Sequence, residues 1–268
     1  MILVTGASGQ LASTLVAAAR SVDLAVITAS RSPDADRQMD FDSPETLDFS
    51  GIETLFLTSA GYAEDDVVMR RHGAVVAAAR DQGVRHIVYS SLSCHSDHLG
   101  FALAHRWTER AIKDSGLAWT ILRNGLYAEL IGSLAVSRDA RITAPFGQGR
   151  ISTVARADLA EAALAVLKSP ASHAGRCYEL SGESAFAVSD IAQSLGVSYA
   201  PLSFAAERER LSHLPLLAFQ APMLMSIYAA AAGGFLYADK TDLKDLVSQP
   251  RDAFLIACAI AQGAVQTI

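Results

Sequence analysis

Short apolar runs alternate with longer amphipathic segments from residue 2 to residue 180. An apolar run of about four to eight residues is typical of a strand buried on both faces, whereas apolar positions three and four apart are typical of a helix. Strands separated by helices and short loops predict an α/β fold with a doubly wound parallel sheet. The predicted strands are 2–4, 24–29, 38–41, 54–58, 86–91, 118–122 and 176–180, and the predicted helices between them are 10–20, 65–82, 99–115 and 159–168.

The pattern is less regular in the C-terminal part of the chain. We expect residues 1–130 to form the sheet domain, which also receives the segment 149–180. Residues 131–268 are expected to form mainly a smaller lobe that covers the ligand crevice. Its predicted helices are 188–195, 204–211, 239–247 and 251–262, and prolines and glycines interrupt its apolar stretch 214–238.

The segment Met1–Ala12, MILVTGASGQLA, places a glycine-containing turn between the first strand and the first helix. Gly6 allows the tight turn, and Gly9 lets a phosphate approach the backbone because it has no Cβ atom. The first N–H groups of the helix, at the positive end of its dipole, then point at the anion. This spacing predicts a dinucleotide-phosphate site; the alternative is a strand–helix turn without a ligand. The residues expected at the phosphates are Gly6, Ala7, Ser8, Gly9, Gln10 and Leu11.

Arg31 stands just beyond the second predicted strand, where folds that bind NADH carry an acidic residue for the ribose 2′-hydroxyl. No acidic residue lies between Asp23 and Asp34. A guanidinium suits a 2′-phosphate because it donates two parallel hydrogen bonds to phosphate oxygens. We therefore expect NADPH to be favoured over NADH, with Arg37 as a candidate second contact. The alternative is that Arg31 is a solvated surface residue.

Small and polar residues follow several predicted strands, whose carboxyl ends face the ligand crevice in such a sheet. Asp40 and Phe41 are expected beside the adenine; alternatively they only form a capping cluster with the short helix that Ser43 and Pro44 begin. The other residues expected to contact the cofactor are Thr58, Ser59 and Ala60 after the fourth strand, Tyr89, Ser90 and Ser91 at the end of the fifth, and Arg123, Asn124, Gly125 and Leu126 after the sixth.

The helix after the fifth strand lacks the Tyr-x-x-x-Lys pair of ordinary short-chain reductases, in which a lysine on the same helix face lowers the tyrosine's pKa. Phe101 and His105 occupy the two positions, so this helix supplies neither a phenol nor a lysine. His105 is a candidate for contacting the nicotinamide ribose or donating a proton near neutral pH. Alternatively it is a helix-face histidine bonded to a neighbour. His105, Asn124 and Tyr127 make up the predicted catalytic set.

Composition excludes several classes of function. The net charge of −6, with scattered lysines and arginines, argues against a nucleic-acid partner. The interruptions in 214–238 argue against a membrane span. Cys94, Cys177 and Cys258 lie far apart without metal-ligand spacing, so we expect no metal site and a reducing compartment. Because residue 1 does not open a signal-peptide pattern, we expect a cytoplasmic protein.

Motifs in order along nearly the whole chain resemble the atypical short-chain dehydrogenases/reductases of the NmrA-like branch, above all bacterial NAD(P)H:quinone oxidoreductases and triphenylmethane reductases. Relatives likewise replace the lysine by histidine and lack the tyrosine. The chain departs from them at 213–232, which is more apolar, and at 187–203, which is shorter. The matching segments are TGASGQLA at 5–12, Arg31, VRHIVYSS at 84–91, LAHRWTERAI at 103–112, SGLAWTILRNGLYAE at 115–129, ARADLAEAALAVL at 155–167, YELSGESAF at 178–186 and GGFLYADKTDL at 233–243.

The resemblance implies a Rossmann-type fold that binds NADPH and passes hydride directly to a small apolar acceptor, such as a quinone or a triphenylmethane dye. Protons for this reaction can come from water, so a missing phenol does not preclude it. A homodimer is the candidate assembly. The alternative function is a non-enzymatic sensor, since some NmrA-like proteins bind NADP and report redox state to a protein partner.

Overall fold

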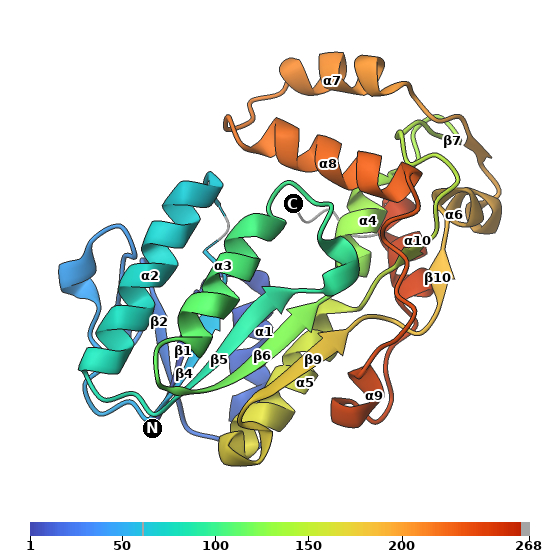
Figure 1. Cartoon of the computed structure of the whole chain (residues 1–268). Helices are drawn as coiled ribbons and strands as arrows, with labels where there is room; N and C mark the ends of the chain where they lie inside the picture. Colours follow the sequence, from blue (N-terminus) through green and yellow to red (C-terminus); the bar gives the residue numbers. More distant parts are fainter. Residues whose placement is uncertain (61, 264–268) are drawn as a thin grey trace.

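The computed structural model describes residues 1–60 and 62–263, and over these residues a seven-stranded, all-parallel sheet forms the centre of the molecule (Figure 1). The strand order is β3-β2-β1-β4-β5-β6-β9. The chain adds strands outward on one side from β1 to β3, and then outward on the other side from β4 to β9. This confirms the predicted doubly wound α/β fold. The strands are β1 (Ile2–Thr5), β2 (Val26–Ser30), β3 (Arg37–Gln38), β4 (Thr54–Thr58), β5 (His86–Leu92), β6 (Ala118–Asn124) and β9 (Arg176–Leu180).

Helices cover both faces of the sheet, which explains why its strands are continuously apolar rather than alternating. Every residue of β5 is buried. The pair α1 and α5 packs on one face, and the pair α2 and α3 packs on the other, in front in Figure 1. These helices are α1 (Gln10–Arg20), α2 (Asp65–Asp81), α3 (Ala102–Lys113) and α5 (Arg156–Lys168).

Several predicted boundaries differ from those in the structure, and local hydrogen bonds explain the differences. The third strand ends at Gln38 because the carboxylate of Asp40 accepts from the Asp42 amide and turns the chain. The short helix that follows, η1 (Pro44–Thr46), has the predicted proline at its start, but the Ser43 side chain does not cap it. The third long helix begins at Ala102 rather than at 99, because 3₁₀-type turns occupy the residues before it.

Most of the remaining elements build a smaller lobe at the carboxyl edge of the sheet (Figure 1). Within it, α10 packs so closely on α4 that a Cβ at Gly132 would lie 2.6 Å from the Ala257 carbonyl oxygen. The predicted helix 239–247 is confined to one short turn. The elements of the lobe are α4 (Ala128–Leu134), β7 (Arg141–Ile142), β8 (Ile151–Ser152), β10 (Ala185–Phe186), α6 (Val188–Leu195), β11 (Ser198–Tyr199), α7 (Phe204–Ser212), α8 (Gln220–Ala232) and α10 (Ala253–Ala261). The short helix α9 (Leu243–Leu246) lies outside it and packs on α5 and β9.

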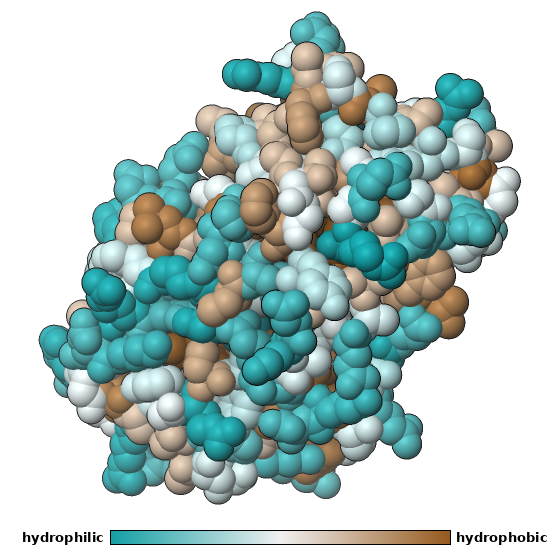
Figure 2. All heavy atoms as spheres, turned by 45° about the vertical axis from the view of Figure 1, so that its right-hand side comes forward, coloured by the Kyte–Doolittle hydropathy of each residue, from teal (hydrophilic) through white to brown (hydrophobic). Residues whose placement is uncertain are grey.

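The apolar stretch 214–238 contains α8, a helix of 13 residues. Across the described parts of the chain, none of the helices combines the length and the apolarity that a membrane crossing requires. Figure 2 shows one face of the molecule, on which hydrophilic side chains predominate and hydrophobic ones form separate small patches.

Candidate functional site

A crevice opens where β1 and β4 end side by side, because the chain leaves these two strands toward opposite faces of the sheet. The regular pairing of the two strands ends at Val4 and Phe56. Beyond it, two threonines bridge the gap: the Thr58 amide donates to Thr5 Oγ1 at 3.0 Å, and Thr58 Oγ1 donates to the Thr5 carbonyl at 2.8 Å. These contacts fix the floor of the crevice.

The glycine turn above this floor has the expected geometry. Gly6 has a φ of +65°, and a Cβ there would lie 3.2 Å from Thr58 Cβ. Gly9 has an ordinary φ of −83°, and its amide donates to the Gly6 carbonyl at 2.8 Å. A Cβ at Gly9 would meet only that carbonyl oxygen, at 3.2 Å. Gly6 is therefore required by the backbone, whereas the lack of a side chain at Gly9 leaves open space above the turn.

The start of α1 offers backbone amides rather than side chains to this space. The first amides of a helix have no intrahelical acceptor, and here they belong to Gln10, Leu11 and Ala12. Leu11 and Ala12 bury their side chains in the core between α1 and the sheet. Ala12 is fully buried, and its small side chain permits close packing of α1 on the sheet.

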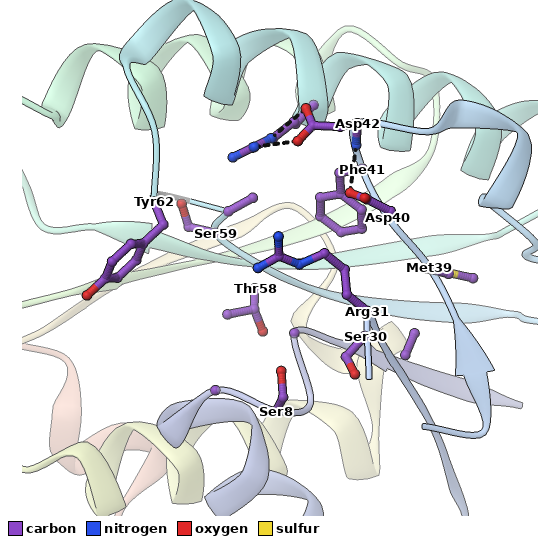
Figure 3. Close-up of a pocket in the computed structure, with 15 residues that line it drawn as sticks. Ser8, Ser30, Arg31, Met39, Asp40, Phe41, Asp42, Thr58, Ser59 and Tyr62 are labelled. Atoms are coloured by element: carbon purple, nitrogen blue, oxygen red, sulfur yellow. Dashed lines mark hydrogen bonds and ion pairs between the residues drawn. The ribbon is translucent and has the colours of Figure 1, made fainter. Parts of the chain in front are cut away.

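A cavity of about 270 Å³ adjoins the turn (Figure 3). It extends from the glycine turn along the ends of β2 and β4. Nine of the residues expected at the cofactor line it. They are Gly6, Ser8 and Gly9 from the turn, and Arg31, Asp40, Phe41, Thr58, Ser59 and Ala60 from the segments that follow the next strands.

Arg31 extends its side chain into the cavity in Figure 3. Arg37 does not line the cavity, and its guanidinium donates to the carbonyls of Asp48 and Ser50, both at 2.7 Å. The prediction of Arg37 as a second phosphate contact is therefore wrong. Asp40 lines the cavity, and its carboxylate also accepts a hydrogen bond from the Asp42 amide; its contact with the adenine stays a prediction.

A second arginine at the cavity was not predicted. Arg71 of α2 lines it and donates to the Asp42 carboxylate through Nε at 2.9 Å and through Nη2 at 2.5 Å, as the dashed lines in Figure 3 mark. The hydrogen bond from Arg71 lowers the pKa of Asp42. Arg71 comes from a helix far along the chain, and no local motif marks it. Tyr62 also lines the cavity and packs edge to face on Phe219, with ring centroids 5.7 Å apart, which joins the C-terminal lobe to this wall.

His105 lies on α3 beside a phenol that the helix pattern did not reveal. The hydroxyl of Tyr89, from β5, lies 2.9 Å from His105 Nδ1. Burial lowers the pKa of His105 to about 4 and raises that of the fully buried Tyr89. The histidine is therefore neutral near pH 7. The helix pattern alone does not predict Tyr89 as a partner, because strand and helix meet only in the folded protein.

Two residues expected at the cofactor are held by a buried carboxylate. Ser91 Oγ donates to Glu109 at 2.6 Å, and the Arg123 guanidinium donates to Glu109 at 2.6 and 2.9 Å and to Glu179 at 3.0 Å. Burial opposes ionisation of Glu109, but the hydrogen bonds from Arg123 and Ser91 outweigh it, and the pKa of the carboxyl is lowered. The Ser91 and Arg123 side chains therefore join α3 to the sheet, and their contacts with the cofactor stay a prediction.

Asn124, Gly125 and Leu126, at the end of β6 and just beyond it, are all buried. The Asn124 amide nitrogen donates to Ser90 Oγ at 2.9 Å, and the Gly125 amide donates to the Leu180 carbonyl at 2.8 Å. Leu126 packs in the core of the C-terminal lobe. Among the described residues, the buried Asn124 Oδ1 has no hydrogen-bond partner.

Tyr127 is turned away from the other two members of the predicted catalytic set. Its ring packs against the core formed with α1 and α5, and the Arg156 guanidinium lies over it, 5.0 Å from the ring centroid. His105 belongs to α3 on the opposite face of the sheet. The predicted trio of His105, Asn124 and Tyr127 is therefore not assembled as one cluster of side chains.

The chain is similar to known proteins that bind nicotinamide dinucleotides. Residues 6–170 match the model of an NAD(P)H-binding family. The chain is 34% identical to quinone oxidoreductase 2 of Escherichia coli, over 93% of this chain and 94% of that protein.

Two solved structures share the whole architecture. Triphenylmethane reductase of Citrobacter sp., complexed with NADP(H), superposes with a TM-score of 0.88 at 27% identity and covers 97% of this chain and 99% of its own. An NADPH-dependent quinone oxidoreductase of Escherichia coli, complexed with NADPH, gives a TM-score of 0.85 at 30% identity, over 96% and 98% of the two chains. The family model covers more than half of this chain, which therefore belongs to the NAD(P)H-binding family.

Proposed function

We propose that this protein is an NADPH-dependent oxidoreductase that passes hydride directly to a quinone or a similar apolar, conjugated acceptor. The observation that carries the proposal is that Arg31 extends into a cavity built on the glycine turn, at the strand end where an NADH-binding fold would carry an acid. The quinone and dye reductases named above share the fold over nearly their whole length.

The residues present fit a dinucleotide. The open space above Gly9 and the free amides at the start of α1 suit the pyrophosphate, and Arg31 suits the 2′-phosphate. Asp40 and Phe41 would flank the adenine. Thr58, Ser59 and Ala60 would line the path of the nicotinamide half toward the ends of β5 and β6, where Tyr89, Ser90, His105, Asn124, Gly125 and Leu126 are gathered.

The proposed reaction does not require a side chain that acts as an acid or a base. Bound NADPH supplies a hydride, and one hydride with one proton from water converts a quinone to a hydroquinone. The protein then needs to hold the two rings in contact and to exclude competing water. A neutral His105 suits this task because it can orient the nicotinamide end by a hydrogen bond without having to give up a proton.

The smaller lobe is proposed to receive the acceptor. Its helix α8 carries largely apolar residues, and Phe219 at its start touches Tyr62 of the cavity wall. The proposed division has residues 1–130 with 149–180 as the dinucleotide-binding domain and mainly 131–268 as the substrate lobe. We further propose a cytoplasmic protein, which the three free cysteines support, and no binding of nucleic acid, which the net charge of −6 supports. A homodimer is the proposed assembly.

The test is oxidation of NADPH by the purified protein with a simple benzoquinone and with a triphenylmethane dye as acceptors. Gly9→Val serves as the control that lacks the phosphate site. We expect steady turnover with an acceptor in the wild type and none in the control. Tight NADPH binding without turnover on either acceptor would contradict the enzymatic function and favour a redox sensor that acts on a protein partner.

A further inference from the structure

A fully buried histidine, His72 of α2, connects the cavity wall to the helix that carries His105. Its Nε2 lies 2.9 Å from the backbone amide nitrogen of Ala60, a residue that lines the cavity. Its Nδ1 lies 2.8 Å from Thr108 Oγ1 on α3. Thr108 Oγ1 in turn donates to the Ala104 carbonyl at 2.7 Å.

Only one tautomer satisfies this chain of hydrogen bonds. The Ala60 amide is a donor, so Nε2 must be the unprotonated acceptor and Nδ1 must carry the proton. Thr108 then accepts from Nδ1 and gives its own proton to Ala104. Desolvation by burial lowers the pKa of His72 to about 3, in agreement with a permanently neutral ring. The donor and the acceptor of each hydrogen bond in this series are therefore fixed.

The same ring supports the Tyr89–His105 pair. The His72 and Tyr89 rings pack edge to face with centroids 5.7 Å apart, and the Tyr89 hydroxyl holds His105. Thr108 follows His105 by one turn on α3. One imidazole thus contacts the loop after β4 through a hydrogen bond, α3 through a second, and β5 through its packing on the Tyr89 ring.

We propose that His72 is a positioning residue for the dinucleotide: it fixes the Ser59–Ala60 wall of the cavity relative to His105. This deepens the proposed function, on which it rests, by naming the residue that sets the width of the path for the nicotinamide half. Among the described residues, His72 is the side chain that accepts a hydrogen bond from the Ala60 amide. Without this hydrogen bond, the Ala60 part of the wall is held less firmly. Binding of the cofactor then has to order the wall, which weakens affinity.

Two substitutions separate the hydrogen bond from the packing. His72→Gln keeps an acceptor near the position of Nε2, whereas His72→Phe keeps a ring but has no acceptor. We expect His72→Phe to weaken NADPH binding by about tenfold, the worth of one hydrogen bond, and His72→Gln to recover most of this loss. Thr108→Val removes the acceptor of Nδ1 without touching Ala60, and we expect a loss between those of the other two variants.

His86 provides a matched control. It is also buried and also bonded to a threonine, with Nε2 2.9 Å from Thr120 Oγ1, but it begins β5 at the amino end of the sheet, opposite the cavity. His86→Phe should lower the melting temperature without changing NADPH affinity.

The measurement is the dissociation constant for NADPH by calorimetry, together with the melting temperature and the ¹⁵N shifts of the His72 ring. Equal affinities in His72→Phe and wild type, equal losses in His72→Phe and His72→Gln, or a protonated Nε2 would overturn the proposal. Should His72→Phe not fold, unchanged affinity in Thr108→Val would overturn it. Because affinity is measured directly, a wild type that binds NADPH without quinone turnover contradicts the proposed activity and leaves the role of His72 to be decided by the variants.

Discussion

The Tyr89 hydroxyl and His105 Nδ1 lie 2.9 Å apart, which joins strand β5 of the sheet to the helix α3. Burial makes the phenol hard to ionise and the imidazole hard to protonate, as the raised pKa of Tyr89 and the lowered pKa of His105 indicate. The pair is therefore neutral on both sides near pH 7. Such a pair holds its members in fixed positions, which is the role expected of a site that transfers hydride without a side-chain acid.

Arg31 should select NADPH over NADH. Arg31→Ala loses a charge-assisted contact to the 2′-phosphate, which should cost ~1.5–3 kcal/mol, or about tenfold to over a hundredfold in NADPH affinity, with little change for NADH. Titration of both cofactors measures this. Arg37→Ala is the control, because it removes an equal charge from a guanidinium that bonds to the Asp48 and Ser50 carbonyls outside the cavity. If Arg31→Ala kept the wild-type preference, another group would be the selector.

Gly9→Val should abolish dinucleotide binding while the protein still folds. Gly9 has an ordinary φ, and an added Cβ meets only the Gly6 carbonyl oxygen, so the protein without cofactor can accommodate a side chain here. The valine would instead occupy the space through which a pyrophosphate approaches the turn. At Gly6, by contrast, the positive φ means that substitution strains the turn itself. Calorimetric binding and circular dichroism of the Gly9→Val variant test this, and normal NADPH affinity in the folded variant would refute the phosphate site.

Stability should fall as the pH falls from 7 to 5. In the unfolded chain a histidine takes up a proton below about 6.5, whereas in the folded protein His72 and His105 resist protonation until pH values of about 3 and about 4. The unfolded state therefore binds more protons in this window, and each histidine contributes up to about 1.4 kcal/mol per pH unit. Urea unfolding at several pH values measures the slope. It should be shallower in His72→Gln, and an unchanged slope would argue against a buried neutral His72.

The sequence predicted those parts of the site that are built by consecutive residues. The glycine turn, Arg31 and the Thr58–Ala60 loop all line one cavity because each directly follows a strand of a parallel sheet, whose strand ends share an edge. The remaining parts depend on contacts between distant segments. Arg71 reaches the cavity from α2, and the Glu109 carboxylate binds the Ser91 and Arg123 side chains. These contacts join segments that are distant in the sequence, so no local pattern predicts them.

The central claim is that hydride passes directly to the acceptor and that His105 orients the cofactor without acting as an acid. The most direct test is quinone reduction at saturating NADPH by wild type and His105→Ala between pH 5.5 and 8.5. Direct transfer predicts that kcat falls only several-fold, that NADPH affinity falls by a hydrogen bond's worth of ~0.5–1.5 kcal/mol, and that neither protein shows a pH limb near neutrality. A thousandfold drop in kcat with loss of a pH limb present in wild type would instead make His105 the essential acid and contradict the account.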